Sequence, residues 1–172
     1  MPSTTNRERI AMHENPIAVR SKSRLADALG TLLQKKRFDS ITITELCAEA
    51  KLSRPAFYQN FNSLGDVAAR YLKIALDKAM GELPSARVSG ARSYARACLD
   101  IYESAHDQVA LLLTNGLADI VVAQCTDAFL EISRRTDYRY IFAASGVASV
   151  IVRDGDYLDR DELADVLERL IG

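Results

Sequence analysis

The side chains best suited to specific molecular recognition lie in the segment 53–60. Arg54 carries a guanidinium that can donate two hydrogen bonds to guanine O6 and N7, and Gln59 carries an amide that can pair with adenine. Pro55 and Ala56 offer apolar contact to the methyl group of thymine. We therefore predict that this segment enters the major groove of duplex DNA, with its N-terminal residues nearest the base edges.

The sequence around this segment contains three helix-start signals. Thr42 and Glu45 form a capping box, in which each side chain satisfies a backbone N–H group at the beginning of a helix. Ser63 and Asp66 repeat that pattern further along the chain. Ser53 lies between the two pairs and is a typical N-cap residue. These signals predict two short helices followed by the start of a third.

A turn and an apolar pair complete the pattern. Lys51 and Leu52 form the turn between the two short helices. Phe57 and Phe61 are four residues apart, so both can pack inward from one face while their polar neighbours point outward. Two helices joined by a tight turn, the second with polar and basic outer positions, describe a helix-turn-helix.

This helix-turn-helix resembles the DNA-binding domain of the tetracycline-repressor (TetR) family of bacterial regulators. The resemblance covers residues 21–71 and is carried by Leu25, Leu29, Leu32, Phe38, Ile41, Thr42, Ile43, Leu46, Ala50, Leu52, Ser53, Phe57, Tyr58, Phe61 and Ser63. It implies a transcriptional regulator that binds a palindromic operator as a homodimer.

The matching family positions also imply which residues contact the phosphates of the DNA. They are Lys22, Thr42, Tyr58 and Asn60. Tyr58 can alternatively brace the motif as a half-buried aromatic side chain, and both roles can hold at once. The complete predicted DNA-binding set is Lys22, Thr42, Ser53, Arg54, Pro55, Ala56, Tyr58, Gln59 and Asn60.

Two positions depart from the family pattern. Lys51 stands where the family usually has a turn glycine, so a left-handed conformation there would cost energy. Leu64 stands where the family often has a lysine that contacts phosphate, which removes one positive charge from the expected DNA surface. An alternative function follows, in which a helical protein kept the fold, lost operator binding and works through protein–protein contact.

The charge is divided unevenly along the 172 residues. The formal net charge is −1, but residues 1–80 contain 13 Lys and Arg against 8 Asp and Glu, whereas the remainder contains 9 against 15. A net charge of +5 in the first part and −6 in the second suits a DNA-binding domain joined to a domain that stays away from DNA.

Helical periodicity without strand alternation predicts an all-α fold. We expect a flexible arm at residues 1–19, a helix-turn-helix domain at 20–72 whose first helix covers 21–36, and a helical domain at 73–172. A helix at 64–80 is expected to connect the two functions. In the first helix, Gly30 interrupts an otherwise regular apolar face.

The C-terminal domain is expected to form the dimer through two apolar-faced helices at 138–152 and 159–171, a helix pair that resembles the closing pair of small TetR-family domains. The predicted interface residues are Tyr140, Ala144, Val147, Ile151, Leu163, Val166, Leu167 and Leu170. A small apolar effector is expected among Tyr94, Cys98, Tyr102, Cys125 and Phe129. The alternative is that these five residues simply fill the core.

Other chemistry finds little support in the sequence. His13 and His106 lack a nucleophile or carboxylate partner at a catalytic spacing, so we expect no enzyme. The three cysteines, including Cys47, have no metal-ligand spacing, and we expect no metal or cofactor. No apolar run is long enough to cross a membrane, and we expect a cytoplasmic protein.

Overall fold

The computed structural model describes residues 15–83, 88 and 90–172, and within them the chain is built from helices and connecting turns. The predicted all-α fold is confirmed. The helices are α1 (Pro16–Leu33), η1 (Phe38–Ser40), α2 (Ile43–Ala50), α3 (Arg54–Tyr58), α4 (Leu64–Glu82), α5 (Ala91–Ser104), α6 (His106–Thr114), α7 (Ala118–Ser133), α8 (Tyr138–Asp154), η2 (Gly155–Tyr157) and α9 (Arg160–Ile171).

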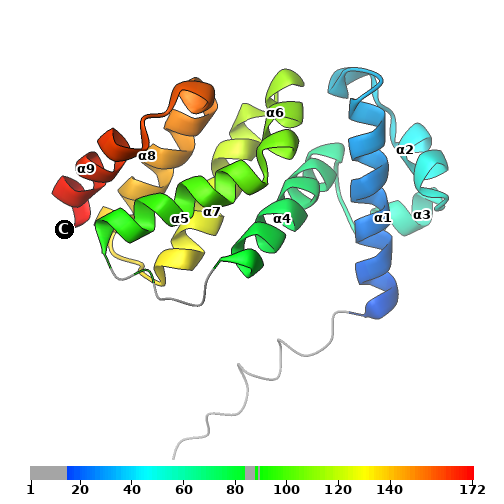
Figure 1. Ribbon diagram of the computed structural model, residues 1–172. Coiled ribbons are helices and arrows are strands. Elements are labelled where there is room, and N and C mark those ends of the chain that lie inside the picture. The colour runs from blue at the N-terminus through cyan, green and yellow to red at the C-terminus, as the bar shows by residue number, and fades with distance from the viewer. Residues whose placement is uncertain (1–14, 84–87, 89) are drawn as a thin grey trace, which may run out of the picture.

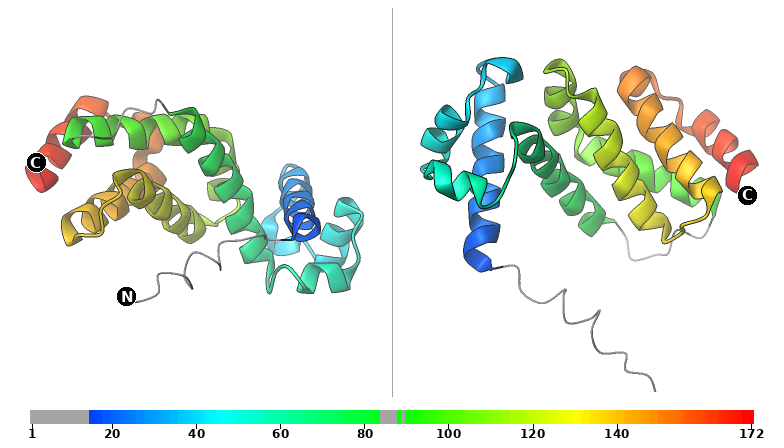
Figure 2. Two further views of the ribbon diagram at one scale, coloured as in Figure 1. Left: turned by 90° about the horizontal axis from the view of Figure 1, so that it is seen from below. Right: turned by 180° about the vertical axis from the view of Figure 1, so that it is seen from behind.

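Two lobes share the connecting helix α4 (Figures 1 and 2). The N-terminal lobe consists of α1, α2, α3 and the beginning of α4, and the C-terminal lobe consists of the remainder of α4 with α5 to α9. The C-terminus lies at the end of the molecule opposite to α2 and α3 (Figure 1). The predicted boundary between residues 72 and 73 falls inside α4, which runs through both lobes without a break.

The core of the N-terminal lobe forms where α1 packs against α2 and α4. Leu25 and Leu29 of α1 are fully buried, as are Leu46 of α2 and Phe57 of α3. These residues recur at helical spacing, which places them on one face of each helix. Burial of each such side chain contributes about 1.5–3 kcal/mol, and the four together fix the short helices against the long ones.

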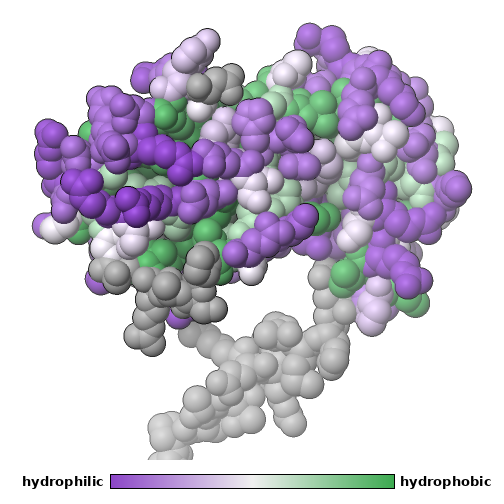
Figure 3. Space-filling view, in the orientation of Figure 1, coloured by the Kyte–Doolittle hydropathy of each residue, from purple (hydrophilic) through white to green (hydrophobic). Residues whose placement is uncertain are grey.

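The C-terminal lobe pairs its helices in two layers. In one, α8 packs along α7, and in the other α9 packs along α5 (Figure 2). Within the described residues, four ion pairs join α5 to α9. Arg92 contacts Asp165 at 2.7 Å and Glu168 at 3.1 Å, and Arg160 contacts Asp100 at 3.4 Å and also Glu103. A hydrophilic band covers α5 and α9 (Figure 3). Because the paired side chains are exposed, they set the register of the two helices more than they add to stability.

The start of α1 corrects the sequence prediction. This helix begins at Pro16 and not at residue 21, because the side chain of Asn15 accepts a hydrogen bond from the Ile17 N–H at 3.0 Å. An asparagine cap followed by proline in the first turn is a strong start signal. The end of the predicted arm, residues 16–19, is therefore helical, while residues 1–14 lie outside the described part of the chain. At its other end, α1 stops at Leu33, before the predicted residue 36.

A hydrogen bond between described residues links the lobes at a second place. The backbone N–H of Phe38 donates to Oδ1 of Asn115 at 3.0 Å, and Nδ2 of Asn115 donates to the Leu111 carbonyl at 2.9 Å. Asn115 ends α6 at the predicted break, where Gly116 has φ +78. The start of η1 in one lobe is thereby tied to the turn between α6 and α7 of the other.

Gly30 has a packing role. A methyl group at this position would lie 2.6 Å from Cε2 of Tyr71, so the absence of a side chain lets α1 and α4 approach each other closely. Overpacking of this kind costs about 1–3 kcal/mol. The better helix propensity of alanine offsets about 1 kcal/mol of that cost.

We predict that Gly30→Ala lowers the free energy of unfolding by about 1 kcal/mol, measured by urea denaturation. The matched control is the double variant Gly30→Ala/Tyr71→Leu, in which the shorter side chain leaves room for the methyl group. The effect of Gly30→Ala should be smaller in the Tyr71→Leu background. A Gly30→Ala protein as stable as the parent would contradict this explanation of the glycine.

Candidate nucleic-acid interface

The predicted reading segment forms α3 and its flanking residues. Ser53 caps the helix by accepting a hydrogen bond from the Ala56 N–H at 3.3 Å. Phe57 is fully buried and Phe61 is 8% exposed, which confirms that both pack inward. Arg54 and Gln59 lie on the exposed side of α3. The segment therefore presents its hydrogen-bonding side chains outward from a buried aromatic anchor.

Pro55 is also exposed, and Ala56 is half-buried. Tyr58 is 52% exposed, and its ring meets the Phe57 ring edge-on at a centroid distance of 5.2 Å. Its hydroxyl lies 3.4 Å from Nη2 of Arg54, one helical turn earlier, and accepts that hydrogen bond. The hydroxyl proton of Tyr58 stays available for another acceptor. Bracing and phosphate contact are thus compatible for this residue.

The turn between α2 and α3 is held by a residue that the sequence analysis did not single out. Nη2 of Arg24 donates to the Ala50 carbonyl at 2.6 Å and to the Lys51 carbonyl at 3.1 Å. These carbonyls at the C-terminal end of α2 lack partners within the helix, and a cation there is favourable. Arg24 lies 26 residues before Ala50, so no local sequence signal could reveal the contact.

Lys51 adopts the left-handed conformation, with φ 53 and ψ 46. The N–H of Leu52 then donates to the Cys47 carbonyl at 2.9 Å, which closes the turn. A residue with a side chain pays for this conformation with roughly 1–2 kcal/mol. The chain therefore keeps the geometry that a glycine would give, at a cost in stability.

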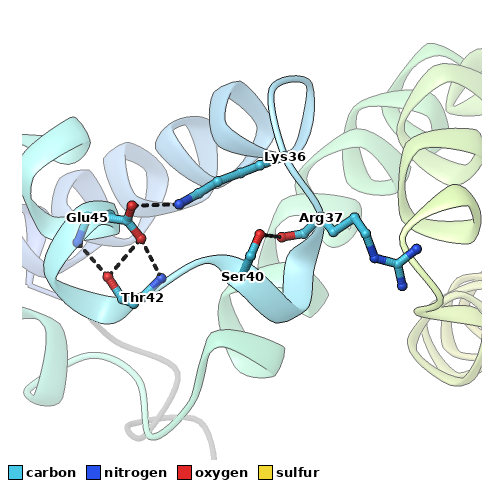
Figure 4. Close-up of polar contacts among 5 residues, drawn as sticks. All are labelled: Lys36, Arg37, Ser40, Thr42 and Glu45. Atoms are coloured by element: carbon cyan, nitrogen blue, oxygen red, sulfur yellow. Dashed lines mark hydrogen bonds and ion pairs between the residues drawn. The ribbon is translucent and has the colours of Figure 1, made fainter.

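The start of α2 is fixed by a small polar network (Figure 4). The Thr42 hydroxyl donates to Oε2 of Glu45 at 2.8 Å and accepts from the Glu45 N–H at 3.2 Å. Nζ of Lys36 lies 2.5 Å from Oε1 of Glu45. The hydrogen bond from Lys36, with those from Thr42, lowers the pKa of Glu45 from 4.5 to about 2. The predicted capping box is confirmed, and Lys36 adds a cation to it.

The network bears on the predicted phosphate contacts. The Thr42 hydroxyl proton is directed to Glu45, and Nδ2 of Asn60 donates to the Ala56 carbonyl at 2.7 Å. Both donors are thus engaged within the protein. Lys22 is half-buried on α1, outside the helix-turn-helix itself. The side chain of Leu64 packs against the core, which gives this departure from the family pattern a structural role.

The predicted dimer interface needs a correction. The side chains of Ala144, Val147, Ile151 and Leu167 are buried within their own chain, so they cannot form a surface for a partner. Tyr140 and Leu163 are half-buried, while Val166 and Leu170 are exposed. Because α8 is apolar around most of its circumference, the sequence did not show which face packs against α7.

The exposed face of α8 carries other apolar residues. Tyr138 is 80% exposed, Phe142 is 69% exposed and Ile141 is 38% exposed. Gly146 and Ser149 continue this face towards the end of the helix. Large exposed apolar side chains that gather on one face indicate a contact surface.

The predicted effector residues lie in the core of the C-terminal lobe. Tyr94, Cys98, Cys125 and Phe129 are fully buried, and Tyr102 is 7% exposed. Burial raises the pKa of Cys98 and raises the pKa of Cys125 to about 12, so both are neutral thiols. The Tyr94 hydroxyl lies beside the Cys98 thiol, and no oxygen or nitrogen of the described residues bonds to it. Effector binding at these five residues stays a prediction.

The described residues contain no group of three or more His, Cys, Asp or Glu side chains that could hold a metal ion. No helix among them has the length and apolar character needed to cross a membrane.

Comparisons with known proteins identify the fold. No protein-family model matches the sequence, and neither does any curated protein. Among solved structures, the chain is similar to the TetR family repressor AlkX from Dietzia sp. strain DQ12-45-1b, a protein implicated in the biodegradation of n-alkanes. The TM-score is 0.50 at 17% sequence identity, and the match covers 87% of this chain and 97% of that chain. The chain has a TetR-like fold.

We predict that Lys51→Gly raises the free energy of unfolding by about 0.5–1 kcal/mol, because glycine adopts the left-handed conformation without strain but loses more backbone entropy on folding. Urea denaturation measures the change. Lys51→Gln is the control, since it removes the charge but keeps the side chain, and it should leave stability unchanged. Equal effects of the two substitutions would contradict the backbone explanation.

Proposed function

We propose that this chain is a transcriptional regulator that binds a palindromic DNA operator as a homodimer and reads its sequence through α3. The observation that carries the proposal is the surface of α3 within a TetR-like fold. Arg54 and Gln59 are exposed there, and the buried Phe57 fixes the orientation of the helix. Arginine and glutamine are side chains that distinguish base pairs in the major groove.

The division of charge supports the same function. Residues 1–80 carry a net charge of +5, and the remainder carries −6. The α2–α3 end of the molecule is the end farthest from the C-terminus (Figure 1), so the acidic lobe need not approach the phosphates. A basic lobe of this kind attracts DNA through the release of counterions, and its binding weakens as salt increases.

The exposed apolar residues of α8 and α9 support the homodimer. Tyr138, Phe142 and Ile141 on α8 and Val166 and Leu170 on α9 are exposed in the single chain. Gly146 and Ser149 on the same face of α8 are small enough for a partner helix to approach closely. A two-fold pairing through these helices would present two copies of α3, which suits half-sites one DNA turn apart, about 34–36 Å.

The alternative function is protein–protein contact without operator binding, and the specific observation that favours it is the engagement of two predicted phosphate donors. Thr42 bonds to Glu45, and Asn60 bonds to its own helix. Salt-dependent binding to duplex DNA separates the two functions. A regulator binds duplex DNA with an affinity that falls steeply as the salt concentration rises. An interaction protein does not bind duplex DNA at salt concentrations near the physiological one.

Arg54→Ala should weaken binding to a selected operator by about 1–3 kcal/mol and relax the preference at one base pair in each half-site. Operators would first be selected from fragments of the host genome, and binding measured by fluorescence anisotropy. Lys22→Ala is the comparison, because loss of a phosphate contact weakens binding to all sequences and makes the salt slope shallower by about one. Equal losses on operator and random DNA for Arg54→Ala would contradict sequence reading by α3.

Phe142→Asp should convert the dimer into monomers, as measured by sedimentation equilibrium at micromolar concentration, because it places a charge in an apolar interface. Ile17→Asp is the control, since Ile17 is also exposed but lies on α1 of the other lobe. Circular dichroism should show unchanged helix content for both variants. A parent protein that sediments as a monomer would contradict the proposed assembly. Val147→Asp is unsuitable as a test because Val147 is buried within its own chain.

A further inference from the structure

A cleft of about 810 Å³ opens in the C-terminal lobe, away from the predicted effector residues. It lies between the last turn of α4, one side of α5 and the turn that joins α7 to α8. Its volume is within the range of small-molecule sites, which is about 300–1,000 Å³. Met80, Leu83, Val88 and Ile132 supply an apolar wall.

Three arginines border the same cleft, namely Arg96 from α5 and Arg134 and Arg135 from the turn after α7. Within the described residues, no carboxylate lies at ion-pair distance from any of them, in contrast to Arg92, which contacts Glu168 at 3.1 Å.

Two carboxylates also line the cleft. They are Glu131 and Asp100, and Asp100 shares Arg160 with Glu103, its contact with Nη1 of Arg160 being 3.4 Å. The lining thus holds three guanidiniums and two carboxylates. The net charge of the lining is therefore positive, although the lobe as a whole is acidic.

The turn that carries two of these arginines is rigidly built. Ser133 is largely buried, and its hydroxyl donates to the Leu130 carbonyl at 2.7 Å and accepts from the Arg135 N–H at 3.1 Å. Arg134 has φ 51, a left-handed conformation that is costly for arginine. Backbone strain of this kind persists only where its surroundings enforce it, so these guanidiniums extend from a fixed backbone.

Arg135 connects the cleft to the core of the lobe. Its guanidinium carbon lies 5.5 Å from the centre of the Tyr140 ring, a cation–π contact. The Tyr140 ring in turn meets the Tyr94 ring edge-on at 5.4 Å between centroids. A ligand at the cleft would thus contact an arginine that is already coupled to the buried aromatic residues.

We propose that this cleft binds an amphipathic anion, a molecule with a carboxylate or phosphate headgroup and an apolar chain. The headgroup would bind Arg96 and Arg134, because guanidiniums form paired hydrogen bonds with both kinds of oxyanion. The apolar chain would lie along Met80, Leu83 and Ile132. The role of this ligand as the effector of the regulator rests on the proposed function, but its binding to the cleft does not.

The position of the cleft explains how such a ligand could act on DNA binding. Met80 and Leu83 lie at the C-terminal end of α4, and the N-terminal end of the same helix is capped by Ser63, just after the reading segment. A ligand changes the population of a conformation only if it binds one form more tightly than another. Contact with one end of a helix shared by both lobes provides a physical basis for that difference.

The test compares ligands that share one apolar chain and differ in the headgroup. Dodecanoate and dodecyl phosphate are the anionic probes, dodecanol is the neutral probe, and dodecyltrimethylammonium is the cationic probe. Each is titrated below its micelle-forming concentration into the full chain by isothermal calorimetry. We expect both anions to bind and the cation not to bind. Dodecanol should bind about tenfold more weakly than the anions, or more weakly still, because charge-assisted hydrogen bonds favour the anions.

Arginine variants then locate the site. Arg96→Gln and Arg134→Gln should each weaken the binding of dodecanoate about tenfold and leave dodecanol unaffected. Arg134→Lys should retain part of the affinity because it keeps the charge. Arg37→Gln is the control, since it removes one exposed cation from the other lobe (Figure 4) and should change nothing. Circular dichroism checks that every variant keeps the helix content of the parent.

Three results would overturn the proposal: no binding of either anion, equal binding of dodecanol, or an equal loss of affinity in Arg37→Gln. Binding of the phosphate without the carboxylate, or the reverse, would identify the headgroup and support the site. Binding to selected operator DNA, measured on the ligand-free protein, is scored separately. Operator binding without anion binding overturns the cleft proposal alone, and anion binding without operator binding overturns the proposed function alone.

Discussion

The reading helix depends on the burial of one aromatic side chain. An isolated helix as short as α3, which covers Arg54–Tyr58, is unstable in water because its few hydrogen bonds do not offset the cost of nucleation. Phe57 supplies the missing stability by packing into the core formed by α1 and α2. Arg24 and the left-handed Lys51 then fix the direction in which α3 leaves the turn. The face of α3 that carries the hydrogen-bonding side chains is thus positioned by contacts on the opposite, buried face of the helix.

Local signals allowed much of this lobe to be predicted from sequence. Caps act over three residues and leave a readable pattern, so Thr42, Ser53 and Ser63 marked the starts of their helices. Arg24 and Asn115 act over 26 and 77 residues, and no spacing rule reveals such contacts. The start of α1 was missed although Asn15 and Pro16 are a local signal.

The C-terminal lobe was harder to predict for a different reason. Nearly every turn of α8 is apolar, and periodicity identifies a buried face only when the other face is polar. The interface prediction therefore mixed Val147, which packs against the chain's own core, with Val166, which is exposed. The cleft was not foreseen because its arginines come from two segments, and their shared position depends on how α5 packs beside the end of α7.

The reactivity of the buried cysteines can report the local unfolding of each lobe. Cys47 lies in the N-terminal core, while Cys98 and Cys125 lie in the C-terminal core. Burial raises the pKa of all three thiols, and a thiol reacts with alkylating reagents only as the exposed thiolate. The alkylation rate at each position therefore follows the local unfolding equilibrium of the lobe around it, and mass spectrometry of the three peptides separates the motions of the two lobes without any engineered label.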